Sequence, residues 1–415
     1  ITKKGKELLD GGNKEFLEAK INNEEMSIML FTSGTTNQSK AVMLSHKNIC
    51  TNVKDIRNVF ELDETDRLLS FLPLHHTFEC TVGFLYPLSI GGSIVFSKGV
   101  RHIADELKNF KITAMICVPV VFEKMYDKLM KTIEDKGKMP TVKKGIKLSN
   151  CLLKVGIDIR KKLFKEIHDN LGGCLRVMVA GGAALSPEKE KGFWDLGFNV
   201  LQGYGLTETS PVIAAELTKQ KRLGSIGKKF PSVEVKIDNP DKSGVGELLA
   251  KGDSVMIGYY NNEEANEEVF TEDGWFRTGD LARIDKNGYL YISGRKKFVI
   301  VLKNGKNVYP EEIESLLEKS ELVKECMVFG MPARDGDVTL SVKICYDKDY
   351  VKKQFGDITI DDLKEKIWNW VKEVNKTMPK YKYVKKLILT DEELVKTTTL
   401  KIKRNVEMNK IMKSI

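Results

Sequence analysis

Residues 26–40 read Met26-Ser-Ile-Met-Leu-Phe-Thr-Ser-Gly-Thr-Thr-Asn-Gln-Ser-Lys40, and they decide the fold prediction for the whole chain. The run that ends at Phe31 is mostly apolar, which predicts a buried β-strand. A loop of small residues follows, made of Thr32, Ser33, Gly34, Thr35 and Thr36. Lys40 comes shortly after this loop. Backbone N–H groups and hydroxyls of such a loop can close around phosphate oxygens, and the lysine adds positive charge. A plain turn is the alternative.

The rest of the first half continues the pattern of an α/β protein. Short apolar runs, typical of strands buried on both faces, lie at 112–119, 175–180 and 199–202. Amphipathic stretches at 104–109, 122–132 and 187–196 predict helices between them. This alternation predicts a parallel sheet covered by helices. Residues 80–97 are uncharged, but Pro87 and two glycines interrupt them, so a buried helix, turn and strand is predicted rather than a membrane span.

Two further units follow. From Gly224 to Ser293, short alternating strands separated by glycine turns predict a small antiparallel barrel or sheet. After Arg295-Lys296-Lys297, a hairpin over 298–309, a helix opened by Pro310, two strands, a helix at 361–377 and a last strand predict an α+β domain. We therefore expect a large N-terminal domain at 1–297 and a small C-terminal domain at 298–415.

Composition is that of a globular protein. The chain of 415 residues carries 67 Lys and Arg against 58 Asp and Glu, a net charge of +9, which suits anionic ligands such as nucleotides and coenzyme A but equally suits nucleic acid or an anionic membrane. No basic motif with interleaved aromatic residues is present, so no nucleic-acid partner is predicted. Seven scattered cysteines without metal-ligand spacing predict free, mostly buried thiols in a reducing cytoplasm. The oligomeric state is left open, a homodimer included.

Three later motifs carry polar groups suited to a nucleotide. Tyr204-Gly-Leu-Thr-Glu-Thr-Ser-Pro211 follows a predicted parallel strand, where open sheets bind ligands. Its Glu208 suits Mg²⁺, which pairs one carboxylate with substrate phosphates; a helix N-terminus capped by Thr207 is the alternative. Asp280 can accept ribose hydroxyls and Arg295 can reach ribose or phosphate, unless they form an ordinary salt bridge. Lys401 follows a hydroxyl-rich stretch near the C-terminus, a stretch that by itself is more typical of a solvated basic face.

The order of these blocks, with Gly181-Gly182-Ala-Ala-Leu185 between them, resembles the acyl-adenylate-forming superfamily from about Met26 to Arg404. The resemblance implies a truncated N-terminal domain of parallel α/β sheets with a small β-barrel subdomain, and a mobile α+β C-terminal domain that turns about a hinge at Lys297. It also implies roles for single residues. The phosphate loop is Thr32, Ser33, Gly34, Thr35, Thr36 and Lys40. Adenine and acyl-adenylate contacts fall on Gly182, Gln202, Gly203 and Tyr204. Phosphate and metal positions fall on Thr207, Glu208 and Thr32, ribose contacts on Asp280 and Arg295, and the adenylation lysine is Lys401.

The chain departs from the superfamily pattern in two motifs. The loop usually reads Gly-x-Pro-Lys-Gly where this chain has Asn37-Gln-Ser-Lys-Ala41, and Leu400 stands where glycine usually precedes the lysine. The block Leu72-Pro-Leu-His-His-Thr-Phe-Glu79 lacks the aspartate that holds amino-acid substrates, and it looks like long-chain fatty acyl-CoA synthetases. In that comparison His76 lines the entrance near the reacting carboxylate; a structural histidine is the alternative.

The resemblance implies an enzyme that uses ATP and Mg²⁺ to convert a fatty acid to acyl-AMP and pyrophosphate, and then transfers the acyl group to coenzyme A. Two alternatives stay open: a fatty acyl-AMP or acyl-carrier-protein ligase, and a nucleotide-binding module that has lost catalysis. The lysine-rich stretch 124–165 is predicted to be either a soluble insertion or a peripheral contact with an anionic membrane, on its cytoplasmic face.

Overall fold

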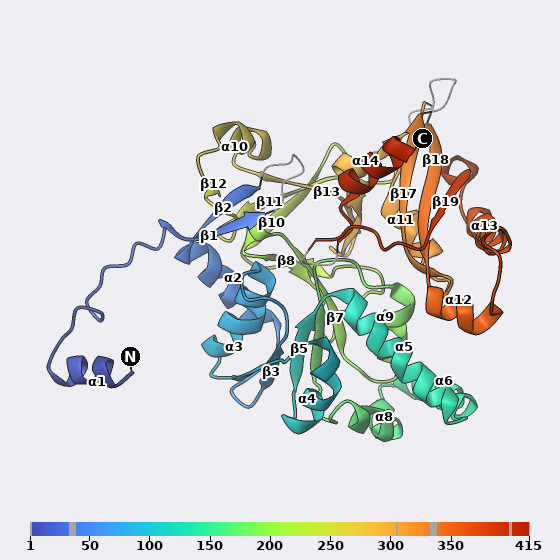
Figure 1. Cartoon of the computed structure of the whole chain (residues 1–415). Coiled ribbons are helices and arrows are strands. Elements are labelled where there is room, and N and C mark those ends of the chain that lie inside the picture. Colours follow the sequence, from blue (N-terminus) through green and yellow to red (C-terminus); the bar gives the residue numbers. More distant parts are fainter. Residues whose placement is uncertain (1, 33–38, 304–305, 333–337, 398–400, 415) are drawn as a thin grey trace.

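The computed structural model describes residues 2–32, 39–303, 306–332, 338–397 and 401–414. Its centre is a seven-stranded sheet in the order β4-β3-β5-β6-β7-β8-β9 (Figure 1). The strands are β3 Arg67–Ser70, β4 Ser93–Phe96, β5 Ala114–Cys117, β6 Val177–Ala180, β7 Val200–Gly205, β8 Val212–Ala215 and β9 Lys228–Lys229. The first five in this order are parallel, and β8 and β9 are antiparallel to their neighbours. The predicted parallel α/β sheet is confirmed, with an antiparallel extension.

Both faces of this sheet are covered, as the uniformly apolar strands predict. Alternate residues of one strand point to opposite faces, so Ala114 and Ile116 enter one apolar cluster whereas Met115 and Cys117 enter another. The helices of this domain are α2 His46–Val59, α3 Tyr86–Ser89, α4 Ile103–Asn109, α5 Pro119–Asp135, α6 Met139–Leu153, α7 Arg160–Leu163, α8 Lys165–Asn170 and α9 Pro187–Asp195. Short turns of helix lie at η1 Phe78–Leu85 and η2 Val100–His102. The first cluster thus lies between the central sheet and the β-subdomain, and the second beneath α5 and α9.

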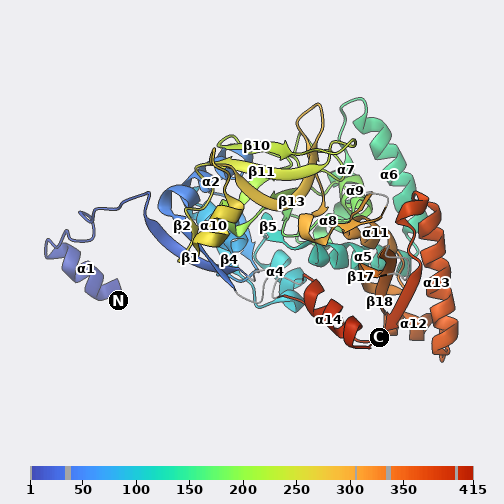
Figure 2. The same cartoon turned by 90° about the horizontal axis from the view of Figure 1, so that it is seen from above.

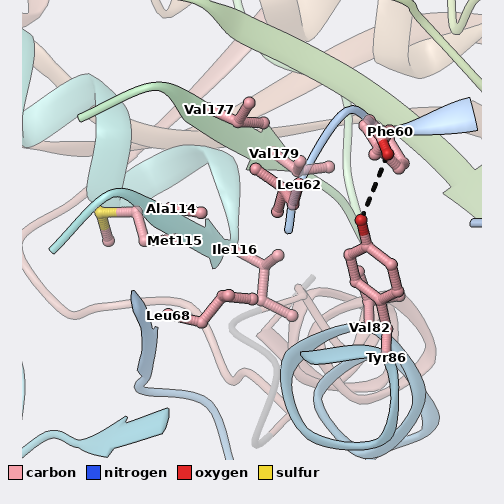
Figure 3. A pocket seen from close by; sticks show the side chains of 10 residues that line it. All are labelled: Phe60, Leu62, Leu68, Val82, Tyr86, Ala114, Met115, Ile116, Val177 and Val179. Carbon is pink, nitrogen blue, oxygen red and sulfur yellow. Dashed lines mark hydrogen bonds between the residues drawn. The ribbon is translucent and has the colours of Figure 1, made fainter. Parts of the chain in front are cut away.

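One small void remains in the first cluster (Figure 3). It measures about 10 Å³ and ten side chains line it, among them Leu68, Ile116 and Val179. Figure 3 shows Tyr86 beside it, whose hydroxyl donates to the carbonyl of Phe60 at 3.3 Å. A space of this size admits about one water molecule and its lining is apolar, so we expect it to be dry. It is far too small for an acyl chain.

The uncharged stretch 80–97 forms the expected helix, turn and strand, but only its helical part is buried: no residue of β4 is buried, and Phe96 is 59% exposed, which corrects that part of the prediction. The π-helical η1 continues directly into α3, and after a turn at Gly91 and Gly92 the chain enters β4. Gly91 has φ +74°, a conformation that favours glycine. None of the helices among the described residues has both the length and the apolar character needed to cross a bilayer.

The strand that precedes the predicted phosphate loop is present but is not buried, which corrects one prediction. β1 Met26–Thr32 pairs antiparallel with β2 Lys40–Ser45, and β12 Gly258–Tyr259 follows as the third strand. β1 is an edge strand with one neighbour, and Phe31 is 72% exposed. The apolar run therefore identified a strand correctly, but burial depends on packing partners that the run itself does not contain. Helix α1 Thr2–Asp10, with no buried residue, lies apart from the body in Figure 1.

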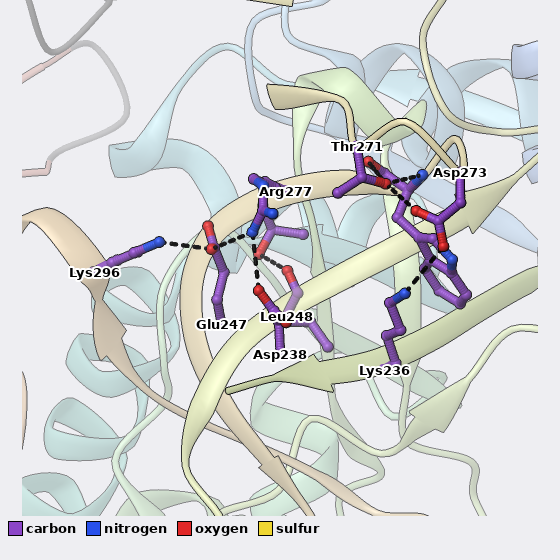
Figure 4. A network of polar contacts seen from close by, with 10 residues as sticks. Lys236, Asp238, Glu247, Leu248, Thr271, Asp273, Arg277 and Lys296 are labelled. Carbon is purple, nitrogen blue, oxygen red and sulfur yellow. Dashed lines mark hydrogen bonds and ion pairs between the residues drawn. The ribbon is translucent and has the colours of Figure 1, made fainter. Parts of the chain in front are cut away.

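The β-subdomain is an antiparallel sheet in the order β10-β11-β13-β14. Its strands are β10 Val233–Asp238, β11 Gly246–Gly252, β13 Phe276–Ile284 and β14 Leu290–Arg295, with α10 Glu263–Val269 between β12 and β13. β10 and β14 are its edges, so it is an open sheet rather than a closed barrel. Figure 4 shows charges that tie its strands together: Arg277 bonds Asp238 at 3.0 Å and Glu247 at 3.2 Å, and Glu247 also accepts from Lys296 at 2.8 Å.

The residues after Lys297 form a smaller α+β unit with its own apolar core. Its elements are η4 Lys296–Phe298, β15 Ile300–Val301, β16 Asn307–Val308, α11 Pro310–Leu317, β17 Val323–Pro332, β18 Val338–Tyr346, α12 Lys348–Phe355, α13 Ile360–Lys376, η5 Lys380–Lys382, β19 Lys386–Thr390 and α14 Arg404–Ser414. The predicted hairpin is confirmed by the antiparallel pairing of β15 with β16, and its turn at 304–305 lies outside the described residues. β17, β18 and β19 form one sheet, with β19 parallel to β18.

All seven cysteines are free thiols, as predicted. The prediction that most of them are buried is wrong, since only Cys117, Cys326 and Cys345 are buried. Cys50 and Cys151 are exposed because they lie on the outer faces of α2 and α6.

Candidate functional site

Tyr204, Asp280 and Arg295 meet where the central sheet adjoins the β-subdomain. Tyr204 stands near the end of β7, and Asp280 and Arg295 are paired across β13 and β14. The Tyr204 hydroxyl donates to Asp280 Oδ2 at 2.6 Å, and Arg295 Nε donates to Asp280 Oδ1 at 2.7 Å. Burial, and then the Asp280 charge, raise the pKa of Tyr204 well above its usual value, so the phenol stays a proton donor. The carboxylate, with a side chain 6% exposed, is therefore fixed in orientation.

A second group joins Glu208 to the lysine of the predicted phosphate loop. Glu208 lies in η3 Thr207–Thr209, just after β7, and accepts from the hydroxyl of Tyr259 at 2.9 Å. The ammonium of Lys40 lies 4.8 Å from the centre of the Tyr259 ring, and it also pairs with Glu268 at 3.7 Å. Burial, followed by the Glu208 charge, raises the pKa of Tyr259. Tyr259 thus contacts both Lys40 and Glu208 and joins them in one group.

Lys401 comes from the C-terminal domain and lies within electrostatic range of both groups. Its ammonium interacts electrostatically with Arg295, Asp280 and Glu208. Desolvation by the surrounding protein lowers the pKa of Lys401 first and Arg295 lowers it further, while the two carboxylates oppose them. Lys401 nevertheless keeps contact with solvent. Its backbone N–H donates to the hydroxyl of Thr397 at 3.2 Å, and its carbonyl accepts from the Thr397 N–H at 2.8 Å.

Arg404 anchors the segment that carries Lys401. Its guanidinium donates to both oxygens of Glu314 on α11 and lies 5.1 Å from the ring centre of Phe298. The fork of an arginine on a carboxylate fixes orientation as well as distance. The carboxyl of Glu311, the neighbouring acid on α11, lies close to Gly294, where a Cβ would meet its oxygen at 2.8 Å. Gly294 and Arg295 therefore lie against the helix that holds Arg404.

Lys297 lies between the two domains, next to these charges. Burial, and then the Arg295 charge, lower the pKa of Lys297 to about 8; the Asp280 charge opposes this shift and the Lys401 charge adds to it. The residue before it, Lys296, is bonded to Glu247 of the β-subdomain (Figure 4). The residue after it is Phe298, beneath Arg404. Its hinge role stays a prediction, as does the domain boundary there.

The remaining predicted residues lie along the carboxyl ends of the strands or outside the described part. The hydroxyls of Thr207 and Thr77 are 3.4 Å apart, next to the half-buried His76. Burial and then His75 lower the pKa of His76, which keeps the imidazole neutral near pH 7. The Thr32 hydroxyl donates to the Lys40 carbonyl at 3.4 Å across β1 and β2. Four predicted loop residues lie outside the described residues: Ser33, Gly34, Thr35 and Thr36.

Gly182 and Gln202 lie behind Tyr204, and both have structural duties. Gly182 has φ +84°, which favours glycine. Gln202 is buried, accepts from the Leu185 N–H at 3.0 Å and donates to Glu190 at 3.0 Å. Because both ends of this amide are used within the protein, any contact with a ligand would fall to the backbone here. Gly203 continues β7 opposite Ala215.

Sequence reasoning missed several residues that hold the site. Tyr259 contacts both Glu208 and Lys40, yet it lies in the two-residue strand β12, where no sequence motif marks it. Thr77 stands in the sequence block 72–79 without an assigned role, and Arg404 marks only the end of the stretch that resembles the superfamily. The hollows of the protein surface do not locate the candidate site either. A hollow of about 370 Å³ lies on the C-terminal domain beside Trp368 and Lys385. None of the residues that line it is a predicted site residue.

Comparison with known proteins agrees with this geometry. The AMP-binding enzyme family matches residues 2–260, and the AMP-binding enzyme C-terminal domain matches residues 297–415. A long-chain-fatty-acid–CoA ligase of Mycobacterium bovis, FadD15, is 30% identical over 96% of this chain and 70% of its own length. A chloroplastic long-chain-fatty-acid–[acyl-carrier-protein] ligase of Arabidopsis thaliana, AEE15, is 26% identical over 95% of this chain and 62% of its own length.

The fold is similar to solved structures of the same kind. The ATP-bound structure of MatB from Rhodopseudomonas palustris superposes with a TM-score of 0.73 at 26% identity, covering 94% of this chain and 69% of that protein. The chain thus spans about 70% of the length of FadD15 and of MatB. It belongs to the AMP-binding enzyme family, and its make-up is that of an ATP-dependent, AMP-forming acyl ligase.

Proposed function

We propose that this protein activates a medium- or long-chain fatty acid with ATP to acyl-AMP and pyrophosphate, and then transfers the acyl group to coenzyme A. The observation that carries the proposal is the approach of Lys401, from the C-terminal domain, to Glu208, Asp280 and Arg295 of the N-terminal domain. Two cations and two carboxylates within electrostatic range of one another suit a nucleotide that carries both hydroxyls and phosphates. The relative from Mycobacterium bovis, named as a long-chain-fatty-acid–CoA ligase, supports the choice of acid and acceptor.

The residues divide the work by their chemistry. Asp280, held by Tyr204 and Arg295, would accept the two ribose hydroxyls, because an oriented carboxylate has lone pairs for both. Lys401 would lie between the fatty acid carboxylate and the α-phosphate. There it would offset the negative charge that builds as the carboxylate oxygen attacks phosphorus and pyrophosphate leaves. The Lys40 ammonium, beside Tyr259, would attract the outer phosphates.

Mg²⁺ fits this site only in company with the nucleotide. No group of three His, Cys, Asp or Glu side chains among the described residues could hold a metal ion. Glu208 offers one carboxylate, and the hydroxyls of Thr207 and Thr32 are further oxygen ligands by type. Mg²⁺ commonly takes one or two carboxylates and completes its octahedron with phosphates and water. When bound, the ion would neutralise phosphate charge and polarise the α-phosphate.

Thioester formation would follow from the chemistry of the intermediate. Acyl-AMP is a mixed anhydride, so a thiol can attack its carbonyl carbon and expel AMP. The hydroxyl of Thr77 lies 3.4 Å from that of Thr207, and His76 is the residue before Thr77, so its neutral imidazole could contact the reacting carboxyl group. His76 would contribute as a hydrogen-bond donor rather than as a charge, since its lowered pKa disfavours the cation.

One assay series tests the proposal. Pyrophosphate release is measured with ATP, Mg²⁺ and acids that range from acetate to palmitate, without any acceptor. We expect release that depends on the acid and increases towards the longer chains. No release with any acid would contradict the proposal and favour a nucleotide-binding module without catalysis. The reason to consider that alternative is the altered loop Asn37-Gln-Ser-Lys-Ala41.

A second function is favoured by one relative and differs only in the acceptor. The Arabidopsis protein is named as a ligase for acyl-carrier protein. Coenzyme A and a phosphopantetheinylated carrier protein are therefore supplied separately after adenylation. Release of free acyl-CoA supports the first function, whereas acylation of the carrier protein alone supports the second.

A further inference from the structure

Helix α6 and the chain after it form a projection that is fixed to the N-terminal domain. The inner side of α6 buries Val142 and Ser149. Asn150 donates to Asp195 of α9 at 2.9 Å, and Arg160 of α7 donates to the carbonyl of Trp194 at 2.6 Å. Figure 2 shows α6 at the outer margin of the molecule. The outer side of α6 is therefore presented in one orientation.

Among the described residues, α6 and the chain after it, as far as α7, carry several exposed apolar side chains. Five lie within sixteen positions of the sequence, with exposed fractions of 54% for Leu148, 38% for Leu153, 71% for Val155, 51% for Ile157 and 42% for Leu163. Leu148 and Leu153 lie on α6, and Val155 and Ile157 follow directly after its end. Exposed apolar residues that occur singly need no explanation, but a group of this density on one projection indicates an interaction surface.

Unpaired lysines surround the apolar group. Residues 139–165 contain eight Lys and Arg and one acid, Asp158, which Arg160 engages at 2.7 Å. Within the part of the chain that the structure describes, six of the lysines form no ion pair: Lys143, Lys144, Lys147, Lys154, Lys161 and Lys162. Neighbouring Lys136 and Lys138, by contrast, both pair with Glu166. The six unpaired lysines thus lie in the same stretch as the apolar side chains, together with the paired residues Arg160 and Lys165.

We propose that this α6 surface, the five apolar residues with the six unpaired lysines, docks on an anionic lipid bilayer. Apolar side chains at a tip can enter the acyl boundary while flanking lysines contact lipid phosphates, as interfacial helices do. Charge selects the bilayer over a second copy of this chain, because two such surfaces would repel each other. The apolar side chains distinguish it from a nucleic-acid surface, which would need stacking aromatics that this projection lacks.

The test is vesicle co-sedimentation of the whole chain, without ATP or fatty acid, so that it does not depend on the proposed enzyme activity. Vesicles of phosphatidylcholine alone are compared with vesicles of phosphatidylcholine and phosphatidylglycerol in equal parts. We expect binding to the anionic vesicles only, and weaker binding as salt rises, because screening shortens the reach of surface charge. Absence of binding to the anionic vesicles would overturn the proposal.

Charge reversal locates the contact. The triple variant Lys144→Glu, Lys147→Glu, Lys154→Glu should weaken anionic-vesicle binding on the order of a hundredfold, since each lysine near the surface contributes about fivefold. The matched control reverses three exposed lysines of the C-terminal domain, Lys352→Glu, Lys353→Glu and Lys364→Glu, with the same change of net charge. Equal loss in both variants would mean attraction by net charge alone and would overturn the assignment to α6.

The apolar part is tested separately. Leu148→Ser with Val155→Ser leaves every charge in place and, because both side chains are exposed, should not affect folding. We expect vesicle binding to fall by at least about tenfold, from the apolar area that no longer enters the lipid. Unchanged vesicle binding would overturn an insertion into lipid. Concentration-dependent dimerisation of the parent chain that this variant abolishes would assign the surface to a second copy and would equally overturn the proposal.

Discussion

Tyr204 and Asp280 are joined by a hydrogen bond of 2.6 Å that connects the central sheet to the β-subdomain. The same carboxylate is held by Arg295 on its other oxygen, at 2.7 Å. A strand end from each sheet therefore contributes to one small group of charges. The C-terminal domain adds Lys401 to it, so residues far apart in the sequence form a single site.

Replacing Asp280 with Asn should weaken ATP binding. The amide has the same shape, but it loses the charge-assisted bonds to Arg295 and offers one acceptor oxygen instead of two. We expect KM for ATP to rise tenfold to about a hundredfold, as for the loss of a hydrogen bond to a charged group. Steady-state kinetics of pyrophosphate release measures it, with Tyr204→Phe as a milder comparison. An unchanged KM for ATP in Asp280→Asn would remove Asp280 from the nucleotide site.

Replacing Glu208 with Gln should change the response to Mg²⁺. The proposed site has this one carboxylate, so its loss should shift the Mg²⁺ concentration for half-maximal adenylation upwards and slow the reaction by orders of magnitude. The control is Glu272→Gln, an exposed acid of the same subdomain. The same Mg²⁺ titration curve for Glu208→Gln and the parent would place the metal elsewhere.

Replacing Lys297 with Pro should separate the two half-reactions. Lys296 is held by Glu247 on one side and Phe298 lies under Arg404 on the other, so a rotation of the C-terminal domain would load onto the dihedrals between them. Proline fixes φ near −65°. If the proline holds the two domains in the arrangement seen in this structure, the adenylation rate should stay near that of the parent and the rate of thioester formation should fall severely.

Lys297→Ala is the matched control, because it removes the side chain and leaves the backbone free to rotate. Both half-reactions are followed separately, by pyrophosphate release and by acyl-CoA formation. Acyl-CoA formation at the parent rate in Lys297→Pro would rule out a hinge at this residue.

Replacing Glu190 with Gln should stabilise the protein at alkaline pH. Glu190 and Glu216 are both fully buried beside Gln202, and burial followed by the Glu216 charge raises the pKa of Glu190 to about 8. The folded state therefore keeps a proton that the unfolded chain, with an ordinary pKa near 4.5, has released. The contribution of Glu190 to the free energy of unfolding is therefore fully present below about pH 4.5 and is lost as the pH rises towards about 8.

The glutamine cannot ionise, so its variant should lack this loss. Above pH of about 8 we expect it to exceed the parent by a few kcal/mol in the free energy of unfolding, of the order that the pKa difference implies. Urea unfolding across the pH range measures it, and Glu188→Gln, exposed on the same helix, is the control. Parallel stability curves for Glu190→Gln and the parent would show that Glu190 is ionised in the fold.

The architecture could be read from the sequence because its signals are local. The apolar runs that became β5, β6 and β7 contain the alternation that places Met115 and Ile116 on opposite faces. Pro310 and two following acids marked the start of α11 in the same way. The burial of β1 could not be read, because an apolar run does not record whether a second neighbour will cover it.

The candidate site was predicted as a set of motifs, but its supports were not. Tyr259 holds Glu208 and orients Lys40 only because β12 lies beside β2, a pairing between distant segments. Glu190 and Glu216 likewise meet only in the fold, and no motif marks either of them. Residues that touch a ligand sit in recognisable loops, whereas those that position them are chosen by tertiary contacts.

The central claim is that Lys401 acts in adenylation, and Lys401→Ala tests it. A cation needed only while charge builds on the phosphates affects only that step. Lys403→Ala is the matched control, a neighbouring exposed lysine of the same segment. We expect the control to keep both half-reactions near the parent rates.

The decisive measurement compares two rates for Lys401→Ala: fatty-acid-dependent pyrophosphate release from ATP, and acyl-CoA formation from synthetic acyl-AMP. The account predicts that the first is abolished while the second stays close to that of the parent. An equal fall of both rates, or pyrophosphate release at the parent rate, would contradict it.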